Sequence, residues 1–158
     1  MEINIESLDR KVFKIALDEE SERQTMNQNM IKSQIKRGVR FDGDEDFVKE
    51  IDRLKISFIR LKLKRKSVFE ISDEEFKFLE RMTKNQTIIS NSRIGDWAPN
   101  GSMTTHFKER YFEDNKNATE EEFEKARLDI IKYDEDLKTC IKQLAEILGV
   151  EYNPNLSW

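Results

Sequence analysis

The side chains best suited to catalysis gather between Ser92 and Tyr111. This segment contains the only histidine of the chain, His106, together with Arg93 and Asp96. A histidine near an acid can act as a general acid or base, and an arginine can hold a substrate anion. No spacing here matches a catalytic motif, so we predict no catalytic residue. A small enzyme built on residues 92–111 is the last of our alternatives.

Metal and cofactor sites have weaker support. Asp42, Asp44 and Asp46 resemble the start of a calcium-binding EF-hand loop, but Phe47 and Arg53 stand where that loop needs Gly and Glu. Acids at a helix start are the better explanation. One cysteine and one histidine cannot build a structural zinc site, and no two glycines have the spacing of a phosphate-binding loop. We therefore predict no metal and no cofactor.

A run of cations gives the strongest indication of a binding surface. Residues 53–66 hold seven basic side chains and no acid, within a chain of net charge -4. The seven are Arg53, Lys55, Arg60, Lys62, Lys64, Arg65 and Lys66. Such segregation indicates an acidic partner, which can be a protein, a nucleic acid, or the acidic helix expected at 119–148 of the same chain. A pI of about 5.3 and the lack of a known nucleic-acid-binding motif count against nucleic acid, which we keep as the first alternative.

The composition predicts an all-α protein. Gly and Pro number only 5 and 2, and 38% of residues are charged, which favours long helices. We expect an elongated bundle with antiparallel, coiled-coil-like helices in a single domain over 1–158. Its helices are predicted at 7–37, 44–66, 72–84, 104–115 and 119–148, with an irregular loop at 85–103 and a tail at 150–158.

Several helix ends carry local signals. Ser72 with Glu75, and Thr119 with Glu122, have the spacing of a capping box, in which a hydroxyl and a carboxylate satisfy free amides at a helix start. Gly149 can adopt the left-handed conformation that commonly ends a helix.

Two segments are ambiguous. The apolar stripe of the first helix fades across residues 18–23, which predicts a kink or a stretch that protrudes into solvent. Apolar and basic residues alternate across 58–64, as in a short strand, although we favour a helix there.

The helix at 119–148 carries a heptad-like seam of apolar residues, including Phe123, Ile130, Leu137 and Leu144. About thirty helical residues span about 45 Å, which is longer than a compact domain of this size. The seam can pack against the helix at 44–66 of the same chain or against a second copy. We favour a homodimer.

Two tryptophans complete the candidate contact residues. Trp97, close to Arg93 in the irregular loop, can anchor that loop or serve as an interface residue. Trp158 at the C-terminal end can dock on the body or be presented to a partner.

These observations predict a non-enzymatic helical interaction protein that acts on a protein partner as an adaptor, regulator or inhibitor of a larger macromolecule. No apolar run is long enough for a signal sequence or a bilayer span, and the single Cys140 suits a reducing compartment, so we expect a cytoplasmic protein without membrane contact. The high usage of Lys, Ile, Asn and Glu suggests a bacterial or phage origin, such as a mobile-element accessory protein acting on a host factor. The first alternative is a nucleic-acid-binding regulator that uses residues 53–66.

Overall fold

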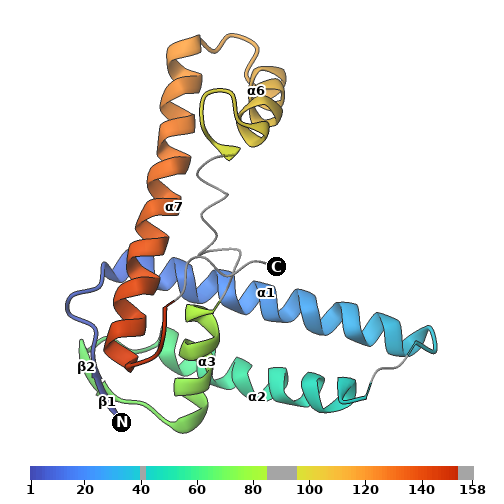
Figure 1. Ribbon diagram of the computed structural model, residues 1–158, viewed down its shortest axis with the longest axis vertical. Coiled ribbons are helices and arrows are strands. Elements are labelled where there is room, and N and C mark those ends of the chain that lie inside the picture. The colour runs from blue at the N-terminus through green and yellow to red at the C-terminus, as the bar shows by residue number, and fades with distance from the viewer. Residues whose placement is uncertain (40–41, 85–95, 153–158) are drawn as a thin grey trace. The chain divides into compact units, whose positions relative to one another are not determined.

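The computed structural model describes residues 1–39, 42–84 and 96–152, and it is predominantly helical within them (Figure 1). The predicted all-α class is confirmed. The described elements are β1 (Glu2–Asn4), α1 (Arg10–Lys36), α2 (Asp44–Lys62), β2 (Val68–Glu70), α3 (Asp73–Thr83), α6 (Ser102–Asp114) and α7 (Glu120–Leu148).

The chain forms two compact units. Unit 1 comprises Met1–Asn85 and Cys140–Tyr152, and unit 2 comprises Gln86–Thr139 and Asn153–Trp158. Helix α7 is continuous and contributes residues to both units. The division therefore leaves the single domain over 1–158 as a prediction.

The body of unit 1 is an α1–α2 hairpin with α3 packed against both helices. The two long helices run side by side in opposite directions, so the start of α1 lies near the end of α2 (Figure 1). Each helix turns an apolar face into the core. The fully buried side chains include Leu17 of α1, Ile51 and Leu54 of α2, and Phe78, Leu79 and Met82 of α3.

A two-stranded ribbon closes one end of unit 1 and was not predicted. Strands β1 and β2 pair antiparallel, with Ile3 opposite Phe69. Ile3 is buried, and Ile5 continues the ribbon by donating its backbone N–H to the carbonyl of Ser67 at 2.8 Å. Three-residue strands are too short to give a periodic signal.

This ribbon explains two errors in the predicted helix ends. The first helix begins at Arg10 with Asp9 as its cap, because the preceding residues lead out of the strand β1. The second ends at Lys62, since the chain must turn to enter β2 at Val68. Residues 58–62 are nevertheless helical, as favoured.

The capping signals were more accurate. Ser72 and Glu75 form the predicted capping box at the start of α3. Thr119 Oγ1 accepts a hydrogen bond from the N–H of Glu122 at 3.2 Å. Gly149 follows α7 with a φ of 70°, which only glycine adopts without strain.

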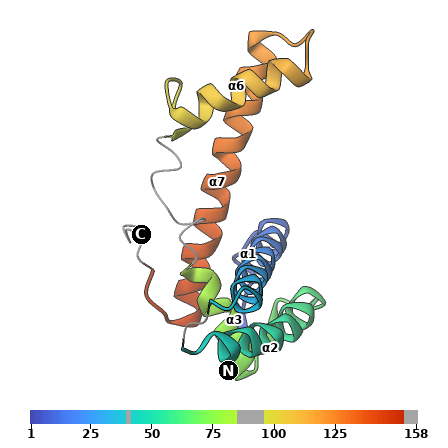
Figure 2. The same cartoon turned by 90° about the vertical axis from the view of Figure 1, so that its right-hand side faces the viewer.

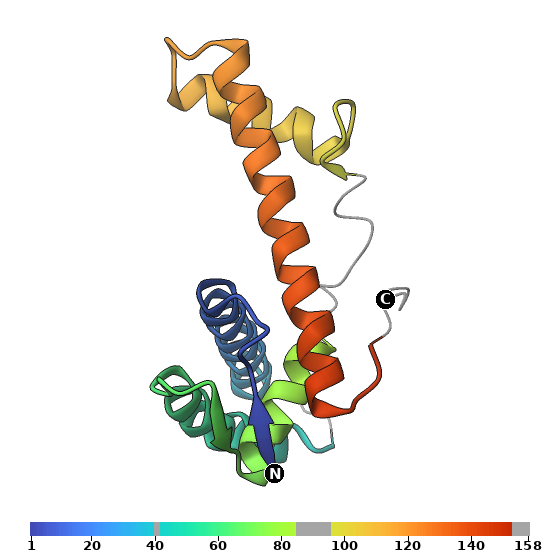
Figure 3. The same ribbon diagram turned by 90° about the vertical axis from the view of Figure 1, so that its left-hand side faces the viewer.

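Unit 2 pairs α6 with the first turns of α7 (Figures 2 and 3). An aromatic cluster lies between the two helices. The ring of Phe107 lies 5.5 Å from that of Trp97 and 5.8 Å from that of Phe123, measured between centroids. Tyr111 and Phe112 pack on the same Phe123 ring. Edge-to-face and tilted contacts of this kind add to the burial of apolar area.

Candidate functional site

The candidate site is the surface of α2 and the residues around it, and it depends on how α1 holds this helix. The apolar stripe of α1 fades in the sequence across residues 18–23. In the structure this face of the helix continues as a polar ladder, that is, three buried polar residues four apart: Glu20, Gln24 and Gln28. Glu20 accepts hydrogen bonds from Arg23 and Gln24, which satisfies its buried carboxylate and raises the pKa of Arg23. The structure therefore shows neither a break in α1 nor a fully exposed stretch at residues 18–23, because the helix is continuous and buries Glu20 there.

Gln28 ties α1 to α2 with three hydrogen bonds. Its amide donates to Asp52 Oδ1 at 2.7 Å and to the carbonyl oxygen of Val48 at 3.2 Å, and its oxygen accepts from Lys55 Nζ at 2.7 Å. The side chain is only 1% exposed. This network fixes one long edge of α2 against α1.

Helix α2 is apolar on two opposite faces. Ile51, Leu54 and Leu61 point into the core. Ile56, Ile59 and Leu63 follow one another at helical spacing on the opposite side and are 56%, 55% and 72% exposed. We call these three residues the apolar stripe. The strand-like alternation in the sequence arose from this second face.

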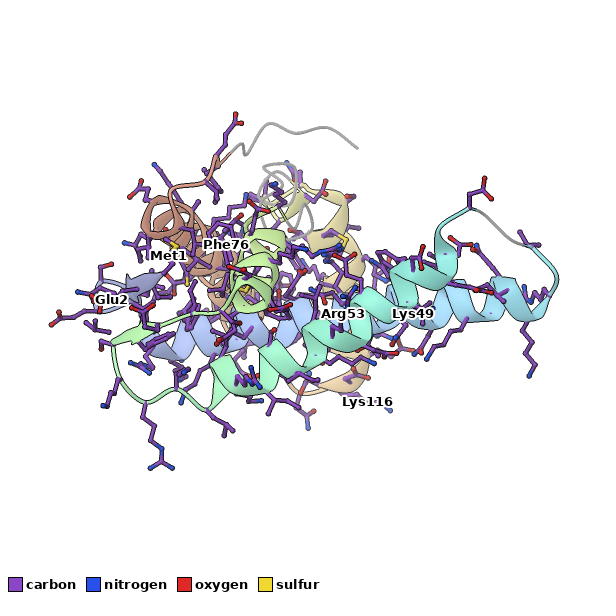
Figure 4. All side chains as sticks on the ribbon, turned by 90° about the horizontal axis from the view of Figure 1, so that it is seen from below. Met1, Glu2, Lys49, Arg53, Phe76 and Lys116 are labelled. Carbon is purple, nitrogen blue, oxygen red and sulfur yellow. The ribbon has the colours of Figure 1, made fainter. Side chains whose placement is uncertain are left out.

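Cations border the stripe on both sides. Lys49, Arg53 and Arg60 lie on the edge away from α1, all exposed (Figure 4 labels Lys49 and Arg53). None of the three makes an ion pair with another described residue. On the α1 side, Lys55 is held by Gln28, and Lys62 pairs with Asp18 at 2.8 Å.

The seven predicted cations thus divide by role. Lys55 and Lys62 bind to the α1–α2 hairpin, and the ammonium of Lys64 lies 5.4 Å from the centre of the Phe69 ring. The exposed and unpaired members, among the described residues, are Arg53, Arg60, Arg65 and Lys66. The acids that pair with the stretch in unit 1 lie on α1 and α2, so its predicted pairing with the helix at 119–148 stays a prediction.

An open recess of about 460 Å³ lies where the end of α2 meets the start of α1. Its lining residues are Arg10, Lys14, Lys62, Leu63, Lys64 and Arg65. Arg10 is fixed there, because its guanidinium donates to the carbonyl oxygen of Lys64 at 3.0 Å and to Ser67 Oγ at 3.3 Å. We call this feature the basic recess.

Trp97 is placed in the interior of unit 2 and is 8% exposed. Arg127, also buried, donates to the carbonyl oxygen of Trp97 at 2.8 Å and forms a bidentate pair with Glu124, which lowers the pKa of Glu124. Trp97 therefore anchors its segment, and its ring offers little surface to a partner. Arg93 and Trp158 lie outside the described residues.

The seam of α7 is largely occupied within the chain. Phe123, Leu137 and Leu144 are buried and Ile130 is half-buried. Phe123 is covered by the aromatic residues of α6. The coiled-coil character and the homodimer stay predictions.

The residues considered for catalysis are not assembled into a constellation in the described part of the segment 92–111. His106 is exposed on α6, while Asp96 accepts a hydrogen bond from Ser102 Oγ at 3.4 Å. Tyr111 belongs to the aromatic cluster. Ser92 and Arg93 lie outside the described residues, so a small enzyme built on this segment stays an alternative.

Sequence reasoning missed Arg10, Lys14 and Lys49 as members of the site, as well as the exposure of the apolar stripe. The two α1 cations lie some fifty residues before the basic stretch and reach it only through the antiparallel hairpin. The stripe had a signal in the sequence, namely apolar residues at 56, 59 and 63 with helical spacing, on the face opposite Ile51, Leu54 and Leu61.

Comparison with known proteins adds no family or function: the chain matches no protein-family model, no curated protein and no solved structure. Among the described residues, no group of three or more His, Cys, Asp or Glu side chains is arranged to hold a metal ion. No helix in the described ranges has both the length and the apolar character needed to cross a bilayer.

Proposed function

We propose that this protein is a non-enzymatic interaction protein that binds an acidic, amphipathic helix of another protein on the exposed face of α2. The single observation behind the proposal is the apolar stripe of Ile56, Ile59 and Leu63, bordered by unpaired Lys49 and Arg53. An apolar row at helical spacing is a surface on which an amphipathic helix docks with its own apolar face. The role of adaptor, regulator or inhibitor needs only such binding.

Docking would bury the apolar area of the stripe. Each of the three side chains of the apolar stripe is already partly buried. Covering the rest of each would contribute about 1 kcal/mol to the binding free energy, since full burial of such a side chain contributes about 1.5 to 3 kcal/mol. Exposed ion pairs at the rim add about 0.2 to 1 kcal/mol each. The apolar contacts therefore supply affinity, and the cations select a partner of negative charge.

The charge pattern favours a different protein over a second copy. Cations border the stripe on both edges, with Arg53 and Arg60 on one edge and Lys55 and Lys62 on the other. Two copies of this face would bring positive charge against positive charge. The homodimer expected from the α7 seam is a separate proposal, and sedimentation at micromolar concentration tests it.

Nucleic acid is the second candidate, because the basic recess adds Arg10 and Lys14 to the end of the basic stretch. Its binding would depend steeply on salt and would not need the apolar stripe. Nuclease treatment separates it from a protein partner.

The proposal is tested by comparing two double variants in a pull-down from nuclease-treated extract of the native host, followed by affinity measurement with the purified retained protein. Ile59→Asp with Leu63→Asp should weaken binding at least tenfold. Met26→Asp with Met30→Asp is the matched control, because these residues are 71% and 56% exposed on α1, outside the stripe. It should change the affinity less than twofold.

Three results would overturn the proposal. One is an equal loss of affinity in both double variants. Another is an undiminished affinity in the stripe variant. The third is a protein that is retained from untreated extract but not from nuclease-treated extract.

A further inference from the structure

We infer that the basic recess binds a phosphomonoester group carried by the acidic segment that docks on the apolar stripe. The inference rests on the proposed function and names the chemistry of one end of the partner segment. A phosphorylated side chain brings a charge of about -1.5 to -2 and three acceptor oxygens. The recess offers the matching donors.

The cations of the recess come from two helices and the turn that follows α2. Arg10 and Lys14 belong to the start of α1, Lys62 to the end of α2, and Lys64 and Arg65 to the turn. Lys14, Lys64 and Arg65 make no ion pair with a described residue. A compact dianion placed among these groups would make several charge-assisted hydrogen bonds at once.

Three of the cations are positioned before any ligand arrives. Arg10 is held by the Lys64 carbonyl oxygen and by Ser67 Oγ, and Lys62 is held by Asp18. The ammonium of Lys64 rests on the Phe69 ring. Groups held in place lose less side-chain entropy on binding than free ones.

Leu63 links the recess to the stripe, because it lines the recess and is also the last residue of the stripe. A helix lying along Ile56, Ile59 and Leu63 would therefore end at the recess. The terminus of the docked segment is where an added phosphate would meet the cations.

The distribution of charge favours a compact anion over a nucleic-acid backbone. The basic residues gather at the end of the hairpin where α1 begins, whereas the opposite end of α2 carries Asp44, Glu45 and Asp46. A long polyanion that follows the hairpin would meet these acids. A single dianion would not.

The test is a titration of O-phospho-L-serine into the full chain, followed by NMR of the lysine side-chain resonances. We expect the side-chain resonances of Lys14 and Lys64 to shift and to reach saturation. Lys14→Gln with Arg65→Gln should weaken the binding by about two- to twenty-five-fold, because each exposed pair removed costs up to about fivefold. Lys32→Gln with Lys36→Gln, at the far end of α1, should change it less than twofold.

Comparison ligands decide the chemistry. Glutamate and dimethyl phosphate, each with a single charge, should bind at least fivefold more weakly than phosphoserine. Shifts that do not saturate, or that fall equally in the two double variants, would overturn the inference. So would tighter binding of a single-stranded oligonucleotide to the same lysines.

The two proposals fail separately. Ile59→Ala, which adds no charge, should leave phosphoserine binding unchanged, since Ile59 does not line the recess. If the stripe variants do not weaken partner binding but phosphoserine still binds the recess, only the proposed partner is contradicted. If phosphoserine does not bind the recess, only this inference is contradicted.

Discussion

Replacing Gln28 with Ala should destabilise the α1–α2 hairpin by about 2 to 4 kcal/mol. The change removes two hydrogen bonds to charged groups, those with Asp52 and Lys55, and one to a backbone carbonyl. Hydrogen bonds to charged groups are worth about 1.5 to 3 kcal/mol each and neutral ones about 1 kcal/mol. Asp52 and Lys55 regain water because their side chains are 58% and 40% exposed, which lowers the expected sum.

Two further terms partly cancel. The Ala variant also loses the packing of one buried methylene group, at about 0.8 kcal/mol, while Ala itself favours a helix by a few tenths of a kcal/mol. The free energy of unfolding is measured by urea denaturation followed by circular dichroism, with the slope against urea unchanged. Asn29→Ala, exposed on the next position of α1, is the control and should stay within about 0.5 kcal/mol.

A loss below 1 kcal/mol for Gln28→Ala would refute the assignment of Gln28 as a main tie between α1 and α2. A double-mutant cycle with Lys55→Ala separates the pair, because contacting residues show coupling energies of about 0.5 to 3 kcal/mol. A coupling near zero would also contradict the network.

Two more predictions concern buried groups outside the stripe. In a Trp158→Phe background, Arg127→Met should shift the fluorescence of Trp97 to longer wavelength, because the backbone carbonyl of Trp97 loses the hydrogen bond that holds the residue in the interior. The control Lys125→Met changes an exposed residue and should not shift the spectrum. An unshifted spectrum in the Arg127 variant would contradict the role of Arg127 as an anchor. Burial raises the pKa of Cys140 from 9.0 to about 12, so a thiol reagent at pH 8 should label the unfolded chain and leave the folded chain unlabelled. Rapid labelling of the native protein would contradict the burial. Because the thiol ionises at lower pH in the unfolded chain than in the folded chain, the free energy of unfolding should fall as the pH rises from 9 to 12, by up to about 1.4 kcal/mol per pH unit.

The elements that sequence reasoning placed well have strong local causes. The capping box of Ser72 and Glu75 specifies the start of α3 through its own two hydrogen bonds. Gly149 likewise ends α7 because its backbone conformation needs no tertiary support. Such signals are readable wherever the chemistry lies within one turn.

The elements that it missed depend on distant parts of the chain. The strand β1 exists because Ile3 pairs opposite Phe69, and neither segment shows a period alone. The continuity of α1 depends on polar side chains that are buried only because α2 supplies partners, as Gln28 shows. In a hydropathy pattern, such a row of polar residues looks like an interruption of the apolar stripe of the helix.

The candidate site was predicted in the same uneven way. Charge alone identified the basic stretch, including Arg53 and Arg60. The sequence pattern indicated the packed face of α2 correctly, through Leu54 and Leu61. It did not indicate that Ile56 stays exposed, since Ile56 is as apolar as Leu54 and only the packing of α1 and α3 buries one and exposes the other. Lys14 joins the recess only once the hairpin is formed.

Photo-crosslinking tests most directly whether α2 presents a docking face to an acidic partner helix. The photoreactive residue p-benzoylphenylalanine replaces Ile59 and, as a control, Met26. We expect position 59 to crosslink in native extract to one protein, through a peptide that is acidic and amphipathic, and position 26 not to do so. Equal crosslinking at both positions, or adducts at position 59 with nucleic acid or with a second copy of this chain, would contradict the claim that α2 presents a docking face to an acidic partner helix.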